Sequence, residues 1–223
     1  MKPIRIALTK GRLEKDTVAL FDQMGMDTAA VKEKGRKLIL PVALPEEMSG
    51  CGRTVEVVLA KAADVITYVE HGVCDLGVVG KDTIAEYGGS FYEVLDLGFG
   101  RCRFALAAPK DKDFFSGYAV KTVASKYPNV SRAYFGGKGM DVRIIKIEGS
   151  VELAPLLGLA DGIVDIVETG STLKENGLRV VEDVMPISAR LIVNMACMKL
   201  RKAELEQLIA QMEQTLEKRR VSQ

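Results

Sequence analysis

The sequence predicts an α/β protein with two lobes. Short, almost entirely apolar runs alternate with amphipathic helical patterns, and the alternation occurs in both halves of the 223-residue chain. Continuous apolar runs are typical of strands buried on both faces of a sheet, and the periodic patterns are typical of the helices that cover it. A composition of 48% hydrophobic and 27% charged residues excludes disordered and fibrous classes.

The first half of the chain contains three expected strands, at residues 4–8, 55–59 and 75–80. The helix after the first strand is predicted from residues that share one face and stop before a glycine: Leu13, Thr17, Leu20, Phe21, Met24 and then Gly25. A second helix is predicted from the same spacing of Ala62, Val65, Ile66 and Val69. The pattern of this half therefore predicts the order strand, helix, strand, helix and strand.

The second half repeats the alternation. We expect strands at residues 103–108, 118–124, 142–147 and 163–167, helices at 128–135 and 151–157, and a short helix ended by Gly177. A late strand at 190–195 and a C-terminal helix follow. We assign residues 1–97 and 184–223 to lobe I and 98–183 to lobe II, and expect a small ligand to bind in the cleft between lobes.

The charges nearly cancel, with 31 Lys and Arg against 30 Asp and Glu for a formal charge of +1. Nothing in this balance recruits nucleic acid or a membrane, so an anion is expected to bind at a local site. Cys51, Cys74, Cys102 and Cys197 are scattered and His71 is the single histidine, which excludes the usual zinc sets. No apolar run approaches the ~18 residues of a membrane span. We expect a cytoplasmic protein with reduced cysteines and no metal ligands of its own.

The most informative segment is residues 165–173. It places Asp165 inside a buried strand and follows it with a hydroxyl-rich turn at the start of a helix. Unpaired backbone N–H groups, the helix dipole and the hydroxyls of Thr169, Ser171 and Thr172 together suit a phosphate. Nearby carboxylates suit sugar hydroxyls. An ordinary helix N-cap, with Asp165 in a salt bridge, is the alternative that this segment alone leaves open.

A second candidate anion site is the turn Thr9-Lys10-Gly11-Arg12, again between a strand and a helix. It offers two cations and a glycine that lets the backbone approach a ligand closely. It lacks the spacing of a Walker A loop, which argues against a P-loop NTPase. The alternative is that Lys10 and Arg12 form only a solvated surface.

Taken together, these segments resemble the ATP phosphoribosyltransferase family. Its signature runs from a glutamate through a glycine-containing stretch to D-hydrophobic-x-x-[ST]-G-x-T-[LM], and residues 152–173 satisfy it throughout. The resemblance covers nearly the whole chain through the segments ALTKGRL, GRKLIL, YVEHGVCDLGVVGKD, LGFGRCRFALAAP, SKYPNVSRAYF and SARLIVN.

The resemblance implies the two-lobed fold of type II periplasmic binding proteins, in which each lobe is a mixed sheet flanked by helices. It implies that N1 of the adenine of ATP attacks C1′ of phosphoribosyl pyrophosphate and releases pyrophosphate, the first step of histidine biosynthesis, with Mg²⁺ carried on the pyrophosphate. Such a displacement needs positioning, cations and a metal more than a protein nucleophile.

The resemblance also implies which residues act. Lys10, Arg36 and Lys61 would be catalytic and supply positive charge near the pyrophosphate and the ATP phosphates. The implied substrate-binding residues are Arg12, Asp75, Gly77, Gly80, Asp82, Glu152, Asp165, Glu168, Thr169, Gly170, Ser171 and Thr172. The loop 165–173 would hold the ribose 5-phosphate and hydroxyls. The sequence departs from the family at Lys61, where an arginine is often found. Lysine keeps the positive charge but lacks the planar guanidinium that can bind a phosphate through two hydrogen bonds.

Long members of the family continue into a histidine-binding regulatory domain, and a chain ending at Gln223 resembles the short form. The resemblance therefore implies a hetero-oligomer with a regulatory subunit related to histidyl-tRNA synthetase, together with self-association.

Two other functions compete with this one. A non-catalytic cytosolic module that binds or senses an anion would share the fold, and fold alone does not decide function. The paired anion turns favour the transferase, since a binder of one small solute needs only one such site. A phosphoribosyltransferase for another base is disfavoured because Asp165 and Glu168 are separated, whereas the usual type I enzymes carry adjacent acids.

Overall fold

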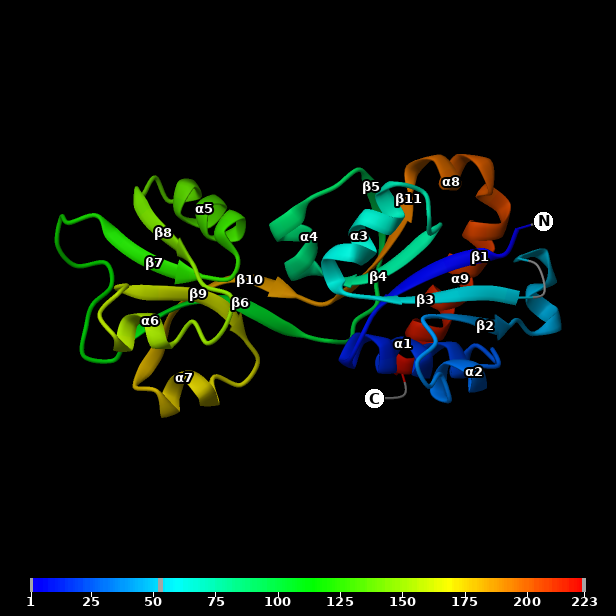
Figure 1. Ribbon diagram of the computed structural model, residues 1–223, viewed down its shortest axis with the longest axis horizontal. Helices are drawn as coiled ribbons and strands as arrows, with labels where there is room; N and C mark the ends of the chain where they lie inside the picture. Colours follow the sequence, from blue (N-terminus) through cyan, green and yellow to red (C-terminus); the bar gives the residue numbers. More distant parts are fainter. Residues whose placement is uncertain (1, 52–53, 222–223) are drawn as a thin grey trace. The chain divides into compact units, whose positions relative to one another are not determined.

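A computed structural model describes residues 2–51 and 54–221. Its contacts divide the chain into two compact units (Figure 1). Unit 1 takes the segment up to Ile84, then Gly88–Gly100, and the chain from Ser188 onward. Unit 2 takes Ala85–Tyr87 and Arg101–Ile187. Within the described ranges no helix is both long and apolar enough to cross a membrane.

Unit 1 is built on a six-stranded sheet in the order β2-β3-β1-β4-β11-β5. Its elements are β1 (Ile4–Thr9), α1 (Arg12–Gln23), α2 (Ala29–Lys32), β2 (Ile39–Ala43), the 3-10 helix η1 (Glu46–Cys51), β3 (Thr54–Ala60), α3 (Ala62–Glu70), β4 (Leu76–Gly80), the start of α4 (Lys81–Tyr87), β5 (Phe91–Asp96), β11 (Ala189–Asn194), α8 (Met195–Leu200) and α9 (Lys202–Val221).

The centre of this sheet is parallel, because β1 pairs in parallel with β3 on one side and with β4 on the other. The outer pairs, β2 with β3, β11 with β4 and β5 with β11, are antiparallel. Ile4, Ile6 and Leu8 belong to the core formed with α1 and α9, whereas Ala7 belongs to the core formed with α3. The alternation of β1 therefore places helices on both faces of the sheet.

Unit 2 is built on a five-stranded sheet in the order β10-β6-β9-β7-β8. Its elements are β6 (Cys102–Pro109), β7 (Lys121–Ser125), α5 (Pro128–Gly137), β8 (Val142–Lys146), α6 (Leu153–Leu156), β9 (Gly162–Val167), α7 (Ser171–Glu175) and β10 (Leu178–Ile187). β7 is parallel to β8 and β9, and β6 is antiparallel to β9 and β10. Each face of the sheet has its own buried apolar cluster.

The prediction of an α/β fold with a mixed sheet flanked by helices in each lobe is confirmed. The sequence analysis did not predict three strands, β2, β5 and β10, and all three lie at the edges of their sheets. Edge strands are partly exposed and so lack a continuous apolar run. β2 has alternately exposed and buried residues, and β5 has none that is fully buried. Two predicted strand ends were also wrong. The strand expected at residues 118–124 begins only at Lys121, and Met195, the expected end of the strand at 190–195, starts α8 instead.

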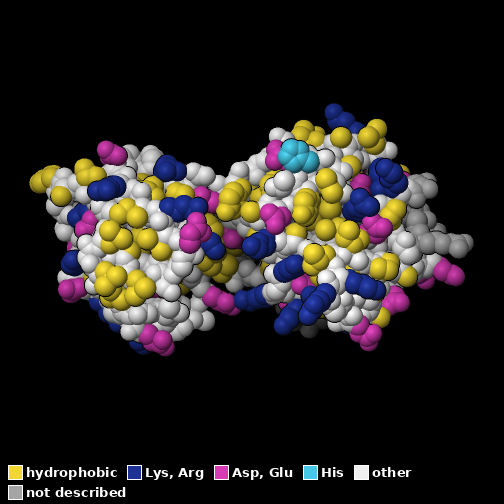
Figure 2. All heavy atoms as spheres, viewed as in Figure 1, with side chains coloured by type: hydrophobic (Ala, Val, Ile, Leu, Met, Phe, Trp, Pro, Cys, Tyr) yellow, Lys and Arg dark blue, Asp and Glu magenta, His cyan; other side chains and the backbone are white. Residues whose placement is uncertain are grey.

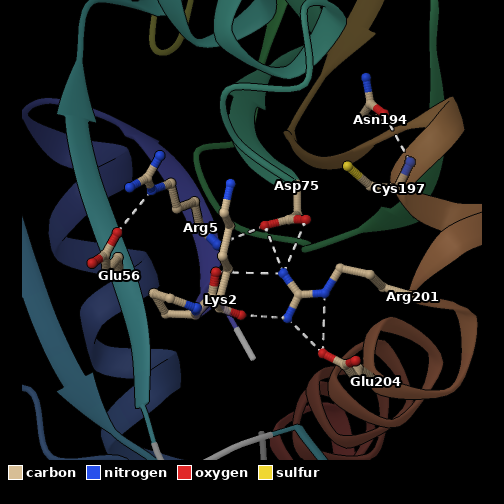
Figure 3. Close-up of polar contacts among 9 residues, drawn as sticks. Lys2, Arg5, Glu56, Asp75, Asn194, Cys197, Arg201 and Glu204 are labelled. Atoms are coloured by element: carbon tan, nitrogen blue, oxygen red, sulfur yellow. Dashed lines mark hydrogen bonds and ion pairs between the residues drawn. The ribbon is translucent and has the colours of Figure 1, made fainter.

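A polar network joins the two ends of the unit 1 chain at the amino end of β4 (Figure 3). The Asp75 carboxylate accepts a hydrogen bond from the Arg5 backbone N–H at 2.8 Å and two from Arg201 Nη1 at 3.3 Å. Arg201 also donates to the carbonyls of Lys2 and Pro3, at 3.0 and 3.4 Å, and pairs with Glu204 at 2.5 Å. One guanidinium therefore ties the start of α9 to β1 and β4.

Gly77 lets α3 approach β4 closely. A Cβ built at Gly77 would lie 2.7 Å from Val69 Cγ2, 2.8 Å from Val65 Cγ1 and 3.2 Å from Ile192 Cγ1. Val65, Val69 and Ile192 are fully buried, so none can move aside into solvent. The glycine is therefore needed for packing between helix and sheet.

We expect Gly77→Ala to lower the free energy of unfolding by about 1–3 kcal/mol through overpacking. Urea denaturation measures it. Gly136→Ala is the matched control, because Gly136 lies in α5 with open space around its Cβ position and an ordinary helical φ. That change should be neutral or stabilising, by up to about 1 kcal/mol. Equal stability of Gly77→Ala and the wild type would contradict the packing role.

We expect Asp75→Ala to lower the free energy of unfolding by about 2–4 kcal/mol, because the side chain is 12% exposed and its loss leaves the Arg201 guanidinium, 18% exposed, short of a partner. Asp111→Ala, at an exposed residue without side-chain contacts among the described residues, should change it by less than about 0.5 kcal/mol. An equally small loss for Asp75→Ala would show that the network is dispensable.

Candidate functional site

The turn between β1 and α1 carries the first group of candidate residues. β1 ends at Thr9, Gly11 has φ 102° and ψ −129°, and Arg12 begins α1. A residue with a side chain rarely adopts this φ, so glycine is required for the sharp entry into the helix. The backbone N–H of Lys10 donates to the Ala60 carbonyl at 2.9 Å, which fixes the turn to the end of β3.

Beside this turn is a cavity of about 400 Å³ with a strongly cationic lining. Figure 2 shows Lys and Arg side chains gathered over the region of α1. The lining includes five cations, Lys10, Lys15, Lys34, Arg36 and Lys37, and a single carboxylate, Glu14. Gly11, Gly35, Leu38 and Leu59 complete it. The predicted residues Lys10 and Arg36 are thus brought together.

Most of these cations are uncompensated. Among residues 2–51 and 54–221, the side chains of Lys10, Lys15, Arg36 and Lys37 form no hydrogen bond or ion pair. Only Lys34 is paired, with Glu14. One phosphate group carries about −1.5 to −2 charges, so this excess suits an anion with more than one phosphate.

The other cationic and acidic candidates of unit 1 lie near the same sheet edge but outside the cavity lining. Lys61 directly follows β3 and is the N-cap of α3. Arg12 is the first residue of α1, and Gly80 is the N-cap of α4. A Cβ at Gly80 would lie 2.0 Å from Asp82 Oδ1, so the glycine makes room for that carboxylate. These residues lie at or just beyond the carboxyl ends of parallel strands, where ligands of α/β sheets commonly bind.

Two of the residues implied by the resemblance lie elsewhere. Asp75 directly precedes β4, at the amino end of that strand, and its carboxylate accepts hydrogen bonds from Arg5 and Arg201. Gly77 lies within β4 against α3. Both residues have a structural role in unit 1, and neither lies at the carboxyl ends of the strands, where Lys10 and Gly80 lie. Their expected substrate-binding roles stay a prediction.

The second group of candidates is the turn between β9 and α7. Gly170 has φ 80°, a left-handed conformation that favours glycine, and directly precedes the helix. Thr169 Oγ1 lies 3.1 Å from Ser171 Oγ and accepts a weak hydrogen bond from the Ser171 N–H at 3.4 Å. Ser171 and Thr172 are exposed in the first turn of α7. The turn therefore gathers hydroxyl and N–H donors at one place.

Asp165 lies two residues before the end of β9 and has an unusual protonation equilibrium. Burial raises the pKa of its carboxyl from 3.8 to about 6. The Ile166 N–H opposes this shift, the charge of Glu152 adds to it, and the charge of Lys126 opposes it. The predicted residues Glu152 and Asp165 therefore lie close enough to influence each other, and a partly protonated Asp165 can both donate and accept hydrogen bonds.

Sequence reasoning missed several side chains around these turns. Arg103 Nη1 donates to the Glu168 carbonyl at 3.4 Å and its Nε pairs with Asp183 at 2.6 Å, so Arg103 supports the β9–α7 turn. Lys126 follows β7 and acts on Asp165 through its charge. Glu14 and Lys34 belong to the cationic cavity. Arg103 and Lys126 stand in segments that carried the resemblance, which was the available signal.

No group of three or more His, Cys, Asp or Glu side chains that could hold a metal ion occurs within the part of the chain that the structure describes.

The raised pKa of Asp165 predicts a pH dependence of stability. Because the folded state binds this proton more tightly than the unfolded state, the stabilisation is fully present below pH 4 and is lost as pH rises through about 6. The free energy of unfolding of the wild type, relative to Asp165→Asn, should fall by about 2 kcal/mol across this window. Denaturation of both proteins from pH 4 to 7 measures it. A constant difference would contradict the shift.

Comparison with known proteins gives one consistent result. The family model for ATP phosphoribosyltransferase, HisG, matches residues 61–214. The ATP phosphoribosyltransferase of Clostridium kluyveri is 59% identical over 208 residues, which are 93% of this chain and 91% of that protein. The Listeria monocytogenes protein of the same name is 53% identical over 221 residues, covering 99% of this chain and 100% of that protein.

Among solved structures, the ATP phosphoribosyl transferase (HisG:HisZ) complex from Thermotoga maritima matches with a TM-score of 0.78 and 30% identity, covering 96% of this chain and 98% of that chain. The periplasmic aliphatic sulphonate binding protein SsuA from Escherichia coli matches with a TM-score of 0.57 and 12% identity, covering 100% of this chain and 75% of that chain. The latter likeness shows the fold alone, and it confirms the expected type II periplasmic-binding-protein architecture. The chain belongs to the ATP phosphoribosyltransferase family.

Proposed function

We propose that this protein transfers the phosphoribosyl group of phosphoribosyl pyrophosphate to N1 of ATP and releases pyrophosphate, as the first step of histidine biosynthesis. The observation that carries the proposal is the cationic cavity beside the Lys10 turn. Five cations against one carboxylate are more than a single phosphate needs, and they suit the polyphosphate chains of these substrates.

In this proposal the β9–α7 turn holds the phosphoribosyl group. Its donors are the hydroxyls of Thr169, Ser171 and Thr172 and the N–H groups at the start of α7, which suit the 5-phosphate. Gly170 keeps the backbone free of a side chain at that point. The carboxylates of Asp165 and Glu168 are suited to the ribose hydroxyls, and Glu152 lies near enough to Asp165 to raise its pKa.

Lys10, Arg36 and Lys61 are proposed to act on the pyrophosphate and on the ATP phosphates, with Arg12, Gly80 and Asp82 as neighbouring binding residues. In the reaction the lone pair of adenine N1 forms the bond to C1′ while the bond from C1′ to pyrophosphate breaks. Negative charge grows on the leaving oxygen, so fixed cations there lower the barrier. Mg²⁺ enters bound to the pyrophosphate of the substrate and shares this role.

We further propose that the protein works in the cytoplasm and in a hetero-oligomer with a regulatory subunit related to histidyl-tRNA synthetase, together with a second copy of itself. The solved structure of the Thermotoga maritima relative supports the hetero-oligomer, because that protein is found in a HisG:HisZ complex. Feedback by histidine would then be sensed on the partner.

A product assay tests the function. Purified protein is mixed with ATP, phosphoribosyl pyrophosphate and Mg²⁺, alone and with the regulatory partner, and the N1-alkylated adenine is followed by its altered ultraviolet absorbance. We expect Lys10→Ala to lower kcat/KM by about 10²-fold because a cation near the leaving group is lost. Thr172→Ala should lower it by about tenfold, through lost binding of the 5-phosphate.

Lys112→Ala is the control, because Lys112 is exposed and its side chain has no contact among the described residues. It should leave kcat/KM unchanged. Absence of product in both conditions, while phosphoribosyl pyrophosphate still binds in calorimetry, would instead favour a non-catalytic module that binds or senses an anion.

A further inference from the structure

Glu14 is a buried carboxylate in a cavity whose other charged lining residues are all cations. It is 7% exposed and lies in the first turn of α1. Its Oε1 accepts from Lys34 Nζ, and its Oε2 accepts from the Gly11 N–H at 3.4 Å. One carboxylate therefore touches both the turn that carries Lys10 and the segment that carries Arg36.

The segment with Lys34 and Arg36 has few other anchors. It is a tight turn in which the Lys37 N–H donates to the Lys34 carbonyl at 3.0 Å, with Gly35 at φ 55°. At its far end the Leu38 carbonyl accepts from the Leu59 N–H at 2.8 Å. Gly35, Arg36, Lys37 and Leu38 are all exposed. The contact between Lys34 and Glu14 is therefore the side-chain attachment at the near end of this turn.

The placement of Glu14 has an electrostatic cost. A negative charge in an anion-binding cavity repels the ligand, so a simple sum of charges predicts that removing it tightens anion binding. A carboxylate also neutralises Lys34. Its presence is consistent with function only if the order it imposes on the cations contributes more than the repulsion subtracts.

We propose that Glu14 is a positioning residue of the polyphosphate site: through Lys34 it holds the turn bearing Arg36 against the turn bearing Lys10. Lys34 then serves as a further phosphate-binding residue, set in place before the ligand arrives. The proposal rests on the proposed function in taking a polyphosphate as the ligand. Pre-ordering matters here because long cationic side chains otherwise lose rotamer freedom on binding.

The test relies on two opposite effects on anion affinity. Loss of the Glu14 charge alone should tighten anion binding, whereas loss of its ordering of the turn should weaken it. Binding of inorganic tripolyphosphate and of ATP to the full chain is measured by calorimetry for the wild type, Glu14→Gln and Glu33→Gln. Glu33 is the matched control, since it is an exposed acid beside the same turn and its side chain has no contact among the described residues. Both changes remove one negative charge near the turn, but only Glu14 is buried in the cavity lining and contacts Lys34 and Gly11.

We expect Glu14→Gln to weaken tripolyphosphate binding by about fivefold, the size of a modest ion-pair contribution, while Glu33→Gln leaves it equal or slightly tighter. Unchanged or tighter binding by Glu14→Gln would overturn the proposal. Thermal unfolding checks that the variants fold. If Glu14→Gln does not, Lys34→Met carries the test, and undiminished binding by that variant would equally overturn it.

A double-mutant cycle tests whether Glu14 acts through Lys34. We expect Glu14→Gln combined with Lys34→Met to bind no more weakly than Lys34→Met alone, whereas independent effects would multiply. In the product assay Glu14→Gln should raise KM for ATP more than it lowers kcat. A wild type that forms product but does not bind tripolyphosphate would overturn this proposal and leave the transferase function intact.

Discussion

The parallel pairing of β1 with both β3 and β4 is the constraint on which the unit 1 site depends. It brings the carboxyl ends of three strands to one edge, so Lys10, Lys61 and Gly80 arrive there from distant parts of the sequence. The amino ends of β1 and β4 are joined by Asp75 and Arg201, which also connect them to the start of α9. The amino ends of these strands are thus held by a polar network, whereas at the carboxyl ends the side chains of Lys10 and Lys61 form no hydrogen bond or ion pair within residues 2–51 and 54–221.

How much of this fold the sequence could predict follows from burial. The central strands are apolar on both faces and were predicted, since both faces are covered by helices. β2 was missed because it is short and its buried residues alternate with exposed ones. β10 was missed because, although it is ten residues long, only its two end residues are buried, so it contains no continuous apolar run. The backbone course of the β9–α7 turn was predicted because its residues are contiguous and glycine fixes its shape, whereas the contact of Arg103 with it was missed.

The site was harder to predict because most of its contacts are not local. The segment from Tyr68 to Asp82 runs along the whole of β4, so a resemblance across it does not reveal that Asp75 and Asp82 lie at opposite sheet edges. The pairing of Glu14 with Lys34 joins residues twenty positions apart and depends on how α1 and the segment before β2 meet. Only coordinates give such direction and contact. Family membership, by contrast, could be predicted from the signature at residues 152–173.

The two turns differ in a way that the chemistry explains. On the proposed assignment, the 5-phosphate keeps its charge throughout the reaction, so hydroxyl and N–H donors at Thr169 to Thr172 bind it equally well before and during transfer. The leaving pyrophosphate gains negative charge as the bond to C1′ breaks, and a fixed cation stabilises that growing charge more than the ground state. Cations at the leaving group therefore raise the rate of the chemical step, whereas equal binding of the 5-phosphate before and during transfer does not. Within residues 2–51 and 54–221, the cavity beside the Lys10 turn has four cations without an ion pair, Lys10, Lys15, Arg36 and Lys37, whereas the Gly170 turn offers neutral donors. This distribution fits the difference between the two phosphate groups.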